Sequence, residues 1–113
     1  MYELKLKHHF DAAHHLELDY DSPCLSAHGH RWEVEVNISA NTLNKNGMLA
    51  DFKKIKEIIN RLDHRDLNES LDFNPTAENI AKHLYDLIIN LVGSSQCSVT
   101  IWESPEASIT YSI

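Results

Sequence analysis

The stretch HGHRWEVEVNI, residues 28–38, carries the strongest structural pattern in this 113-residue chain. Its even-numbered positions hold two histidines and then Trp32, two valines and an isoleucine, whereas Arg31, Glu33 and Glu35 fall between them. Side chains of a strand point alternately to its two faces, so this period of two predicts a strand with one buried face. The same period recurs on both sides of this segment.

Three further segments alternate in this way and predict three more strands. Upstream, residues 2–10 place mostly apolar residues on one parity and mostly charged residues on the other. Downstream, residues 97–101 and 107–113 repeat the pattern at the end of the chain. The polar residues 19–23, between the first two strands, predict a loop.

After Asp51 the period changes to that of a helix. Apolar residues from Phe52 to Leu62 recur at spacings of three and four, and Asp51 is placed to cap the helix N-terminus. A second apolar stripe of the same kind runs from Ile80 to Leu91. The sequence therefore predicts two helices between the second and the third strand.

The second helix has its own start and stop signals. Either Asn74 or Thr76 is placed to cap it, Pro75 favours a position in the first turn, and Gly93 predicts its end. The element order is then ββααββ. We predict one α+β domain over residues 1–113, with an antiparallel four-stranded sheet and both helices on one face.

Composition narrows the class of function. The net charge of −7 argues against a nucleic-acid surface, and no apolar run approaches the roughly 20 residues of a membrane helix. Cys24 and Cys97 lie in a chain with no other sign of a secreted, disulfide-held scaffold. We therefore expect two thiols and a cytoplasmic location.

The eight histidines are the unusual feature of the composition. His28 and His30 are two residues apart on a predicted strand, so their side chains point to the same side with Cα atoms roughly 6.5 Å apart, close enough to chelate one ion. His14 follows the first strand, and a hairpin would bring it to His28. Three imidazoles leave one coordination position open, which is typical of catalytic zinc. The spacing alone does not choose between His14 and His15.

Three other features have two interpretations each. Cys24 lies four residues before His28, where its thiol is either a fourth ligand of a closed structural site or a general base beside the metal. The pair Asp63-His64 ends the first helix, where it is either a helix end with no catalytic role or a proton-transfer pair. Glu103 follows a buried strand, and a carboxylate there is either solvated or directed at a ligand.

In this order the motifs resemble the 6-pyruvoyl-tetrahydropterin synthase superfamily, from about residue 2 to the end of the chain. The matching blocks are Phe10-Asp11-Ala12-Ala13-His14, Cys24-x-x-x-His28-Gly29-His30, Gly47-Met48-Leu49-Ala50-Asp51-Phe52, Leu62-Asp63-His64 with Asp66-Leu67-Asn68, Asn74-Pro75-Thr76-Ala77-Glu78-Asn79, and Trp102-Glu103-Ser104. The resemblance implies the tunnelling fold, commonly assembled as a homohexamer of two trimers with active sites at subunit interfaces.

The resemblance also implies roles for particular residues. The ligands of Zn²⁺ would be His14, His28 and His30. Cys24 would be the general base, and Asp63 with His64 a catalytic pair that reaches the site of a neighbouring subunit.

For the substrate, Glu103 would anchor the pterin ring by accepting two hydrogen bonds. Thr76 and Glu78 would shape its pocket.

Within the superfamily, the three residues between Cys24 and His28 resemble the 6-carboxytetrahydropterin synthases of queuosine biosynthesis. These lyases convert 7,8-dihydroneopterin triphosphate to 6-carboxytetrahydropterin with loss of triphosphate and acetaldehyde. The alternatives are a 6-pyruvoyl-tetrahydropterin synthase or a non-catalytic zinc-binding assembly module on the same fold. Candidates to neutralise the triphosphate include Arg31, Lys53, Lys54 and Arg65, although no basic patch is evident.

Overall fold

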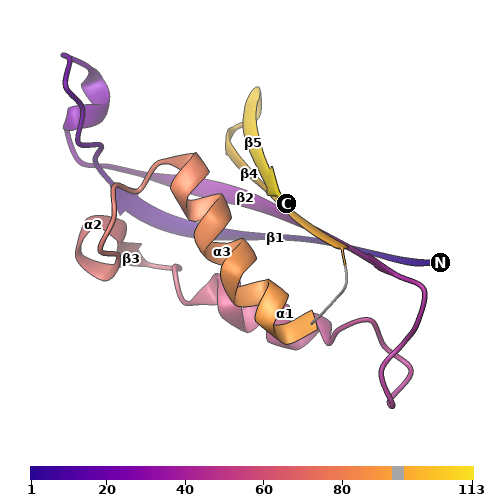
Figure 1. Cartoon of the computed structure of the whole chain (residues 1–113). Coiled ribbons are helices and arrows are strands. Elements are labelled where there is room, and N and C mark those ends of the chain that lie inside the picture. The colour runs from indigo at the N-terminus through magenta and orange to yellow at the C-terminus, as the bar shows by residue number, and fades with distance from the viewer. Residues whose placement is uncertain (93–95) are drawn as a thin grey trace.

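The computed structural model describes residues 1–92 and 96–113 and shows a curved sheet with helices packed on one face (Figure 1). The long strands are β1 (Tyr2–His14), β2 (His28–Ala40), β4 (Gln96–Ser104) and β5 (Ala107–Ser112), and β3 (Arg65–Asp66) is short. The helices are α1 (Phe52–Asn60), α2 (Leu67–Ser70) and α3 (Ala77–Val92), with a 3-10 turn η1 at Pro23–Leu25. The predicted α+β class and the order of the main elements are confirmed.

The sheet has five strands in the order β3-β1-β2-β4-β5. The pairs β1–β2, β2–β4 and β4–β5 are antiparallel. The prediction of a purely antiparallel four-stranded sheet was wrong in one respect, because β3 pairs parallel with Ala12 and Ala13 of β1. A strand of two residues is too short to show a period of two, so the sequence pattern did not reveal it. α2, a helix of four residues, was missed for the same reason.

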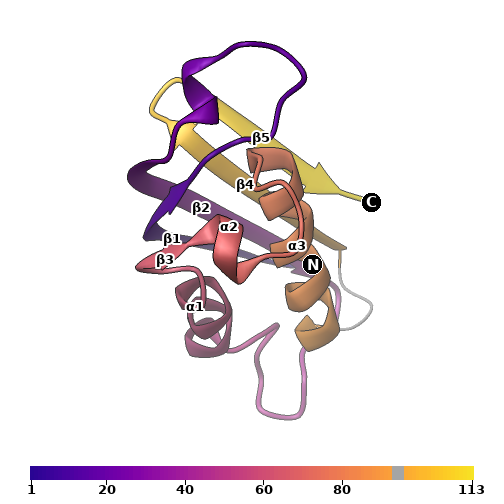
Figure 2. The same cartoon turned by 90° about the vertical axis from the view of Figure 1, so that its left-hand side faces the viewer.

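The alternation of the strands places one face of the sheet in the core. On β2, Trp32, Val34, Val36 and Ile38 are at most 1% exposed, whereas the residues between them face away from the helices. α1 packs against β1, and α3 packs against β4 and β5 (Figures 1 and 2). Both long helices therefore cover the same face of the sheet, as predicted.

The helix ends follow most of the sequence signals. Asp51 caps α1 by accepting a hydrogen bond from the Lys53 amide at 2.9 Å. Thr76 caps α3, because its hydroxyl accepts from the Asn79 amide at 3.1 Å. Pro75 lies before the helix and not in its first turn, since α3 begins at Ala77.

Two other expectations about the helices had different outcomes. Phe52, predicted within the apolar stripe of the first helix, is 56% exposed. The predicted stop at Gly93 lies outside the described residues. In the part of the chain that the structure describes, no helix is both long enough and apolar enough to cross a membrane. Cys24 and Cys97 are free thiols.

Candidate metal centre

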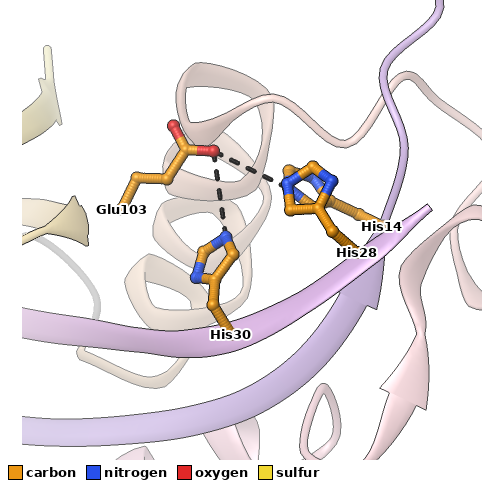
Figure 3. A group of neighbouring side chains, drawn as sticks. All are labelled: His14, His28, His30 and Glu103. Carbon is orange, nitrogen blue, oxygen red and sulfur yellow. Dashed lines mark hydrogen bonds and ion pairs between the residues drawn. The ribbon is translucent and has the colours of Figure 1, made fainter. Parts of the chain in front are cut away.

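Three histidines and one glutamate gather at one end of the sheet (Figure 3). His14, the last residue of β1, pairs directly with His28, the first residue of β2, and His30 lies two residues further on the same face. Glu103 reaches the group from β4, at a point where the register between β4 and β5 shifts. One ligand atom from each of the four side chains lies within 4.8 Å of the others.

Backbone carbonyls orient all three imidazoles. Each Nδ1 atom lies 2.9, 2.9 or 3.0 Å from a carbonyl oxygen, and a carbonyl only accepts, so Nδ1 carries the proton. The acceptors are Pro75 for His14, Ser26 for His28 and Arg31 for His30. In a neutral ring this leaves Nε2 as a lone pair, which is how protein frameworks prepare histidines for metal binding.

The atoms that face one another are therefore electron-rich. Nε2 of His14 is 3.1 Å from Nε2 of His28, and the Glu103 Oε1 lies 3.7 Å from Nε2 of His14 and 3.9 Å from Nε2 of His30. Nε2 of His30 is buried and has no hydrogen-bond partner among the residues that the structure describes. Such a group repels itself unless a cation or a proton lies between its members.

A proton is the weaker explanation at neutral pH. His14 is 1% exposed, and burial together with the neighbouring His28 and His30 holds its pKa below the usual histidine value, against the opposing effects of the Pro75 carbonyl and Glu103. Two nitrogen ligands of a tetrahedral zinc ion lie roughly 3.3 Å apart, given Zn–N distances of about 2.0–2.1 Å. The 3.1 Å between His14 and His28 fits that spacing. The donor set therefore suits a divalent metal ion such as zinc.

The neighbouring His15 is held elsewhere. Its amide donates to the Asn68 side-chain oxygen at 2.8 Å, its carbonyl accepts from Asn68 at 3.0 Å, and its ring lies 3.3 Å from the same side chain. The structure thus brings His14, and not His15, to His28 and His30.

Trp32 forms the floor of the histidine group, a role that the sequence analysis missed. It is completely buried, its ring centroid is 4.4 Å from that of His30 and 4.7 Å from that of His14, and Phe10 stacks on it at 5.7 Å. The signal was available, because Trp32 shares the parity of His28 and His30. This packing limits how far the two imidazoles can rotate.

Cys24 lies beside the histidine loop but outside the group. It sits in η1, half-buried, where its amide donates to the Ser22 hydroxyl at 3.2 Å and its carbonyl accepts from the Leu16 amide at 2.7 Å. Among the described residues, the convergent group consists of the three histidines and Glu103. This geometry does not favour a closed site with Cys24 as fourth ligand.

Asp63 and His64 form a bonded pair away from the convergent group. Nδ1 of His64 lies 2.9 Å from Asp63, and the His64 side chain is 81% exposed. The Asp11 amide donates to Asp63 at 2.9 Å, and this bond, with that from His64, lowers the pKa of the Asp63 carboxyl below its usual value. The Asp63–His64 hydrogen bond is therefore formed, but within this chain the His64 imidazole faces solvent.

The segment before α3 contacts one of the three histidines, His14, through its backbone. Pro75 supplies the carbonyl that orients His14, whereas the Thr76 hydroxyl caps the helix and Glu78 is exposed in its first turn. The Arg31 guanidinium is already paired with Asp11 at 2.9 Å. The structure therefore offers no support for Arg31 as a free cation for a triphosphate.

Comparisons with known proteins show which family the chain belongs to. A relative from Rickettsia conorii, a 6-carboxy-5,6,7,8-tetrahydropterin synthase, is 30% identical over 88% of this chain and 92% of its own. A relative from Pyrococcus furiosus, a dihydroneopterin monophosphate aldolase, is 35% identical over 88% of each chain. The fold matches that of the 6-pyruvoyl tetrahydropterin synthase of Caenorhabditis elegans with a TM-score of 0.78, covering 99% of this chain and 95% of that one at 24% identity. Residues 3–113 match the family described as 6-pyruvoyl tetrahydropterin synthase, and the chain belongs to this family.

Proposed function

We propose that this chain is a zinc-dependent lyase that converts 7,8-dihydroneopterin triphosphate to 6-carboxytetrahydropterin, with loss of triphosphate and acetaldehyde. The observation that carries the proposal is the convergence of three unprotonated Nε2 atoms, from His14, His28 and His30, beside the carboxylate of Glu103. A Lewis acid held by three neutral ligands keeps a coordination position for substrate. The similarity to the Rickettsia conorii enzyme supports the carboxytetrahydropterin activity within the family.

In this proposal His14, His28 and His30 hold the metal. When bound there, zinc would supply Lewis-acid chemistry, polarising hydroxyl oxygens of the substrate's C6 side chain and so acidifying the adjacent C–H bonds. The carbonyls of Pro75 and Ser26 hold two of the imidazoles in the tautomer that this requires. Their contribution is orientation: each ring is fixed by one hydrogen bond before any ion arrives.

Proton transfer falls to Cys24 and to the pair Asp63–His64. Asp63 accepts from Nδ1 of His64, which leaves Nε2 of the exposed imidazole available to a substrate. Because His64 faces solvent in its own chain, we propose that it serves the site of a neighbouring copy, in a homohexamer of two trimers. Cys24, in the loop that leads to His28, would act as the base within the chain that holds the metal.

Glu103 is proposed to bind the pterin ring. A carboxylate accepts two parallel hydrogen bonds from the N–H groups of a guanidine-like edge, and the side chain is 41% exposed, so it is accessible to a ligand. Thr76 and Glu78, at the start of α3, would border the same pocket. Glu103 lies far enough from the histidine nitrogens, at 3.7 and 3.9 Å, to serve substrate and not only the metal.

A second candidate activity has an observation in its favour. The match to the Pyrococcus furiosus aldolase spans the same 88% of this chain as the match to the Rickettsia conorii synthase, and its sequence identity is slightly higher, at 35% against 30%. An aldolase would cleave the same C6 side chain to a hydroxymethylpterin without expelling triphosphate. The three residues between Cys24 and His28, which include no glutamate, favour the carboxytetrahydropterin reaction.

The product decides between these activities. Zinc-loaded protein is incubated separately with 7,8-dihydroneopterin triphosphate and with the monophosphate, and the products are resolved by liquid chromatography and mass spectrometry, with a parallel assay for acetaldehyde. We expect a carboxytetrahydropterin and acetaldehyde from the triphosphate. A pyruvoyl product without acetaldehyde would assign the sister activity, and a hydroxymethylpterin would assign the aldolase. No turnover by zinc-loaded, assembled protein would favour a non-catalytic module.

A further inference from the structure

The Asp63–His64 pair is docked on one residue of β1. The backbone amide of Asp11 donates to the Asp63 carboxylate at 2.9 Å, and its carbonyl accepts from the His64 amide at 2.6 Å. The next residues of β1 pair with β3, which begins at Arg65. Both backbone groups of Asp11 are thus used to hold the pair, three residues before the candidate ligand His14.

His64 is held in an uncommon backbone conformation. Its φ of 57° lies in the left-handed region, where a non-glycine residue needs support from its surroundings. Two contacts provide that support: the His64 amide donates to the Asp11 carbonyl, and the His64 imidazole pairs with the Asp63 carboxylate. The orientation of the imidazole therefore depends on the geometry around Asp11.

Asp11 also places a second negative charge near Asp63. The Asp63 carboxylate lies close enough to the Asp11 carboxylate to disfavour ionisation of Asp11, whereas the nearby His9 on β1 favours ionisation of both carboxylates. Arg31 lies directly opposite Asp11 on β2 and donates to both of its carboxylate oxygens, at 2.9 and 3.2 Å. Asp11, Glu33 and Asp63 all stabilise the charged form of Arg31 and raise its pKa.

We propose that Arg31 is a positioning residue for the Asp63–His64 pair: it fixes Asp11 with a two-pronged ion pair and offsets its charge, so that Asp63 stays ionised and bonded to His64. The inference rests on the proposed function, in which Asp63 and His64 move protons. It assigns Arg31 to the proton-transfer pair and not to the triphosphate.

The test compares R31Q, D11N and the double variant. In R31Q the charge of Asp11 is left uncompensated beside Asp63, so the pKa of the Asp63 carboxyl rises, the His64 amide exchanges faster and kcat falls about tenfold. That loss is smaller than the 10²–10⁴-fold contribution of an acid–base group itself. In D11N the backbone groups that dock the pair remain and Arg31 is free to face Asp63, so the Asp63 pKa does not rise. In the double variant the Asp63 pKa, the exchange rate of the His64 amide and kcat return toward their wild-type values.

K5Q is the matched control, because Lys5 and Glu35 form another ion pair between β1 and β2, at 3.7 Å, on the same face of the sheet. K5Q should leave the Asp63 pKa, the exchange rate of the His64 amide and kcat unchanged. R31K keeps the positive charge but cannot bond both Asp11 oxygens as the planar guanidinium does. It should bring the Asp63 pKa most of the way back to its wild-type value. The Asp63 titration is followed by carbon NMR of its carboxyl, and amide exchange by proton NMR.

An ion pair with a purely structural role would give the opposite pattern. R31Q and D11N would then have equal effects, and the double variant would restore nothing. An unchanged Asp63 pKa and unchanged His64 exchange in R31Q would also overturn the proposal. If the wild type turns over no pterin, the proposed function fails, whereas the NMR measurements still decide whether Arg31 positions the pair.

Discussion

His14 and His28 face each other in the last pair of the β1–β2 ladder, next to the connecting loop, with their Nε2 atoms 3.1 Å apart and both Nδ1 protons donated to backbone carbonyls. Two lone pairs at this distance repel in the absence of a cation. The fold holds them together through a strand pair of thirteen residues a side, which supplies the stability that the site itself lacks. Metal binding should therefore stabilise the folded chain.

Substituting His14, His28 or His30 by Ala should weaken zinc binding by more than about a hundredfold, since loss of even an outer partner of a ligand typically costs 10–100-fold. Competition with a chelator of known affinity measures the effect. H15A is the matched control, because His15 is bonded to Asn68 and lies outside the group. Weakened zinc binding in H15A, with H14A unaffected, would contradict the assignment of His14.

Trp32 should report ion binding directly. Its ring is 4.4 Å from His30 and 4.7 Å from His14, so an open-shell ion such as Co²⁺ at the histidines should strongly quench its fluorescence. In W102F, which leaves Trp32 as the one tryptophan, titration with Co²⁺ should give saturable quenching that zinc reverses. The converse variant, W32F, keeps Trp102 on the other face of the sheet and should show little change. Equal quenching in both variants would place the ion elsewhere.

The sequence predicted the long elements well because each carries a period over many residues. β2 alternates over thirteen positions and α3 has an apolar stripe over sixteen residues, so packing enforces the pattern at every turn. β3 and α2 have two and four residues and show no period. Their positions follow from tertiary contacts, such as the bond from the His64 amide to Asp11, which no local pattern encodes.

The candidate site was predictable where it depends on strand parity. Continuing the parity of Leu4 and Phe10 through β1 reaches His14 and excludes His15, but ending the predicted strand at Phe10 concealed this. The register His14↔His28 was not predictable, because a loop of thirteen residues, 15–27, separates the two strands. Loop length limits how strongly a hairpin fixes its register. The pairing of Arg31 with Asp11 follows from that same register.

The two thiols should differ in reactivity and in function. Burial raises the pKa of Cys97 to about 11 and leaves its side chain 8% exposed, whereas Cys24 is half-buried in a surface loop. Iodoacetamide should therefore alkylate Cys24 of the native protein and spare Cys97. C24A should keep zinc and lose kcat by about 10²–10⁴-fold, as expected for a general base. C97A is the control and should keep both; loss of zinc from C24A would instead support a closed site.

His83 should make stability depend on pH. Burial lowers its pKa, with Arg61 adding to the effect and Asp86 and Asp72 opposing it, and the ring packs on Phe73. The unfolded chain takes up this proton near the ordinary value of 6.5, before the folded chain does, so stability is complete above that pH and falls as the pH decreases below it. Urea unfolding at pH 7.5 and 5.5 should show a smaller loss in H83Q than in the wild type. An equal loss in both would contradict the prediction.

Glu103 distinguishes substrate binding from metal binding. E103Q keeps the shape of the side chain but loses its charge, and one hydrogen bond to a charged group contributes about 1.5–3 kcal/mol. The KM for the pterin should therefore rise by roughly 10- to 150-fold. Zinc affinity should change little, because Oε1 lies 3.7 and 3.9 Å from the histidine nitrogens, beyond the separation of roughly 3.3 Å expected of two ligands on one tetrahedral zinc ion. E106Q, in the exposed turn after β4, is the matched control and should alter neither quantity. If E103Q instead released zinc while the KM of the remaining loaded enzyme stayed constant, the carboxylate would be a fourth ligand, and the coordination position proposed for substrate would be closed.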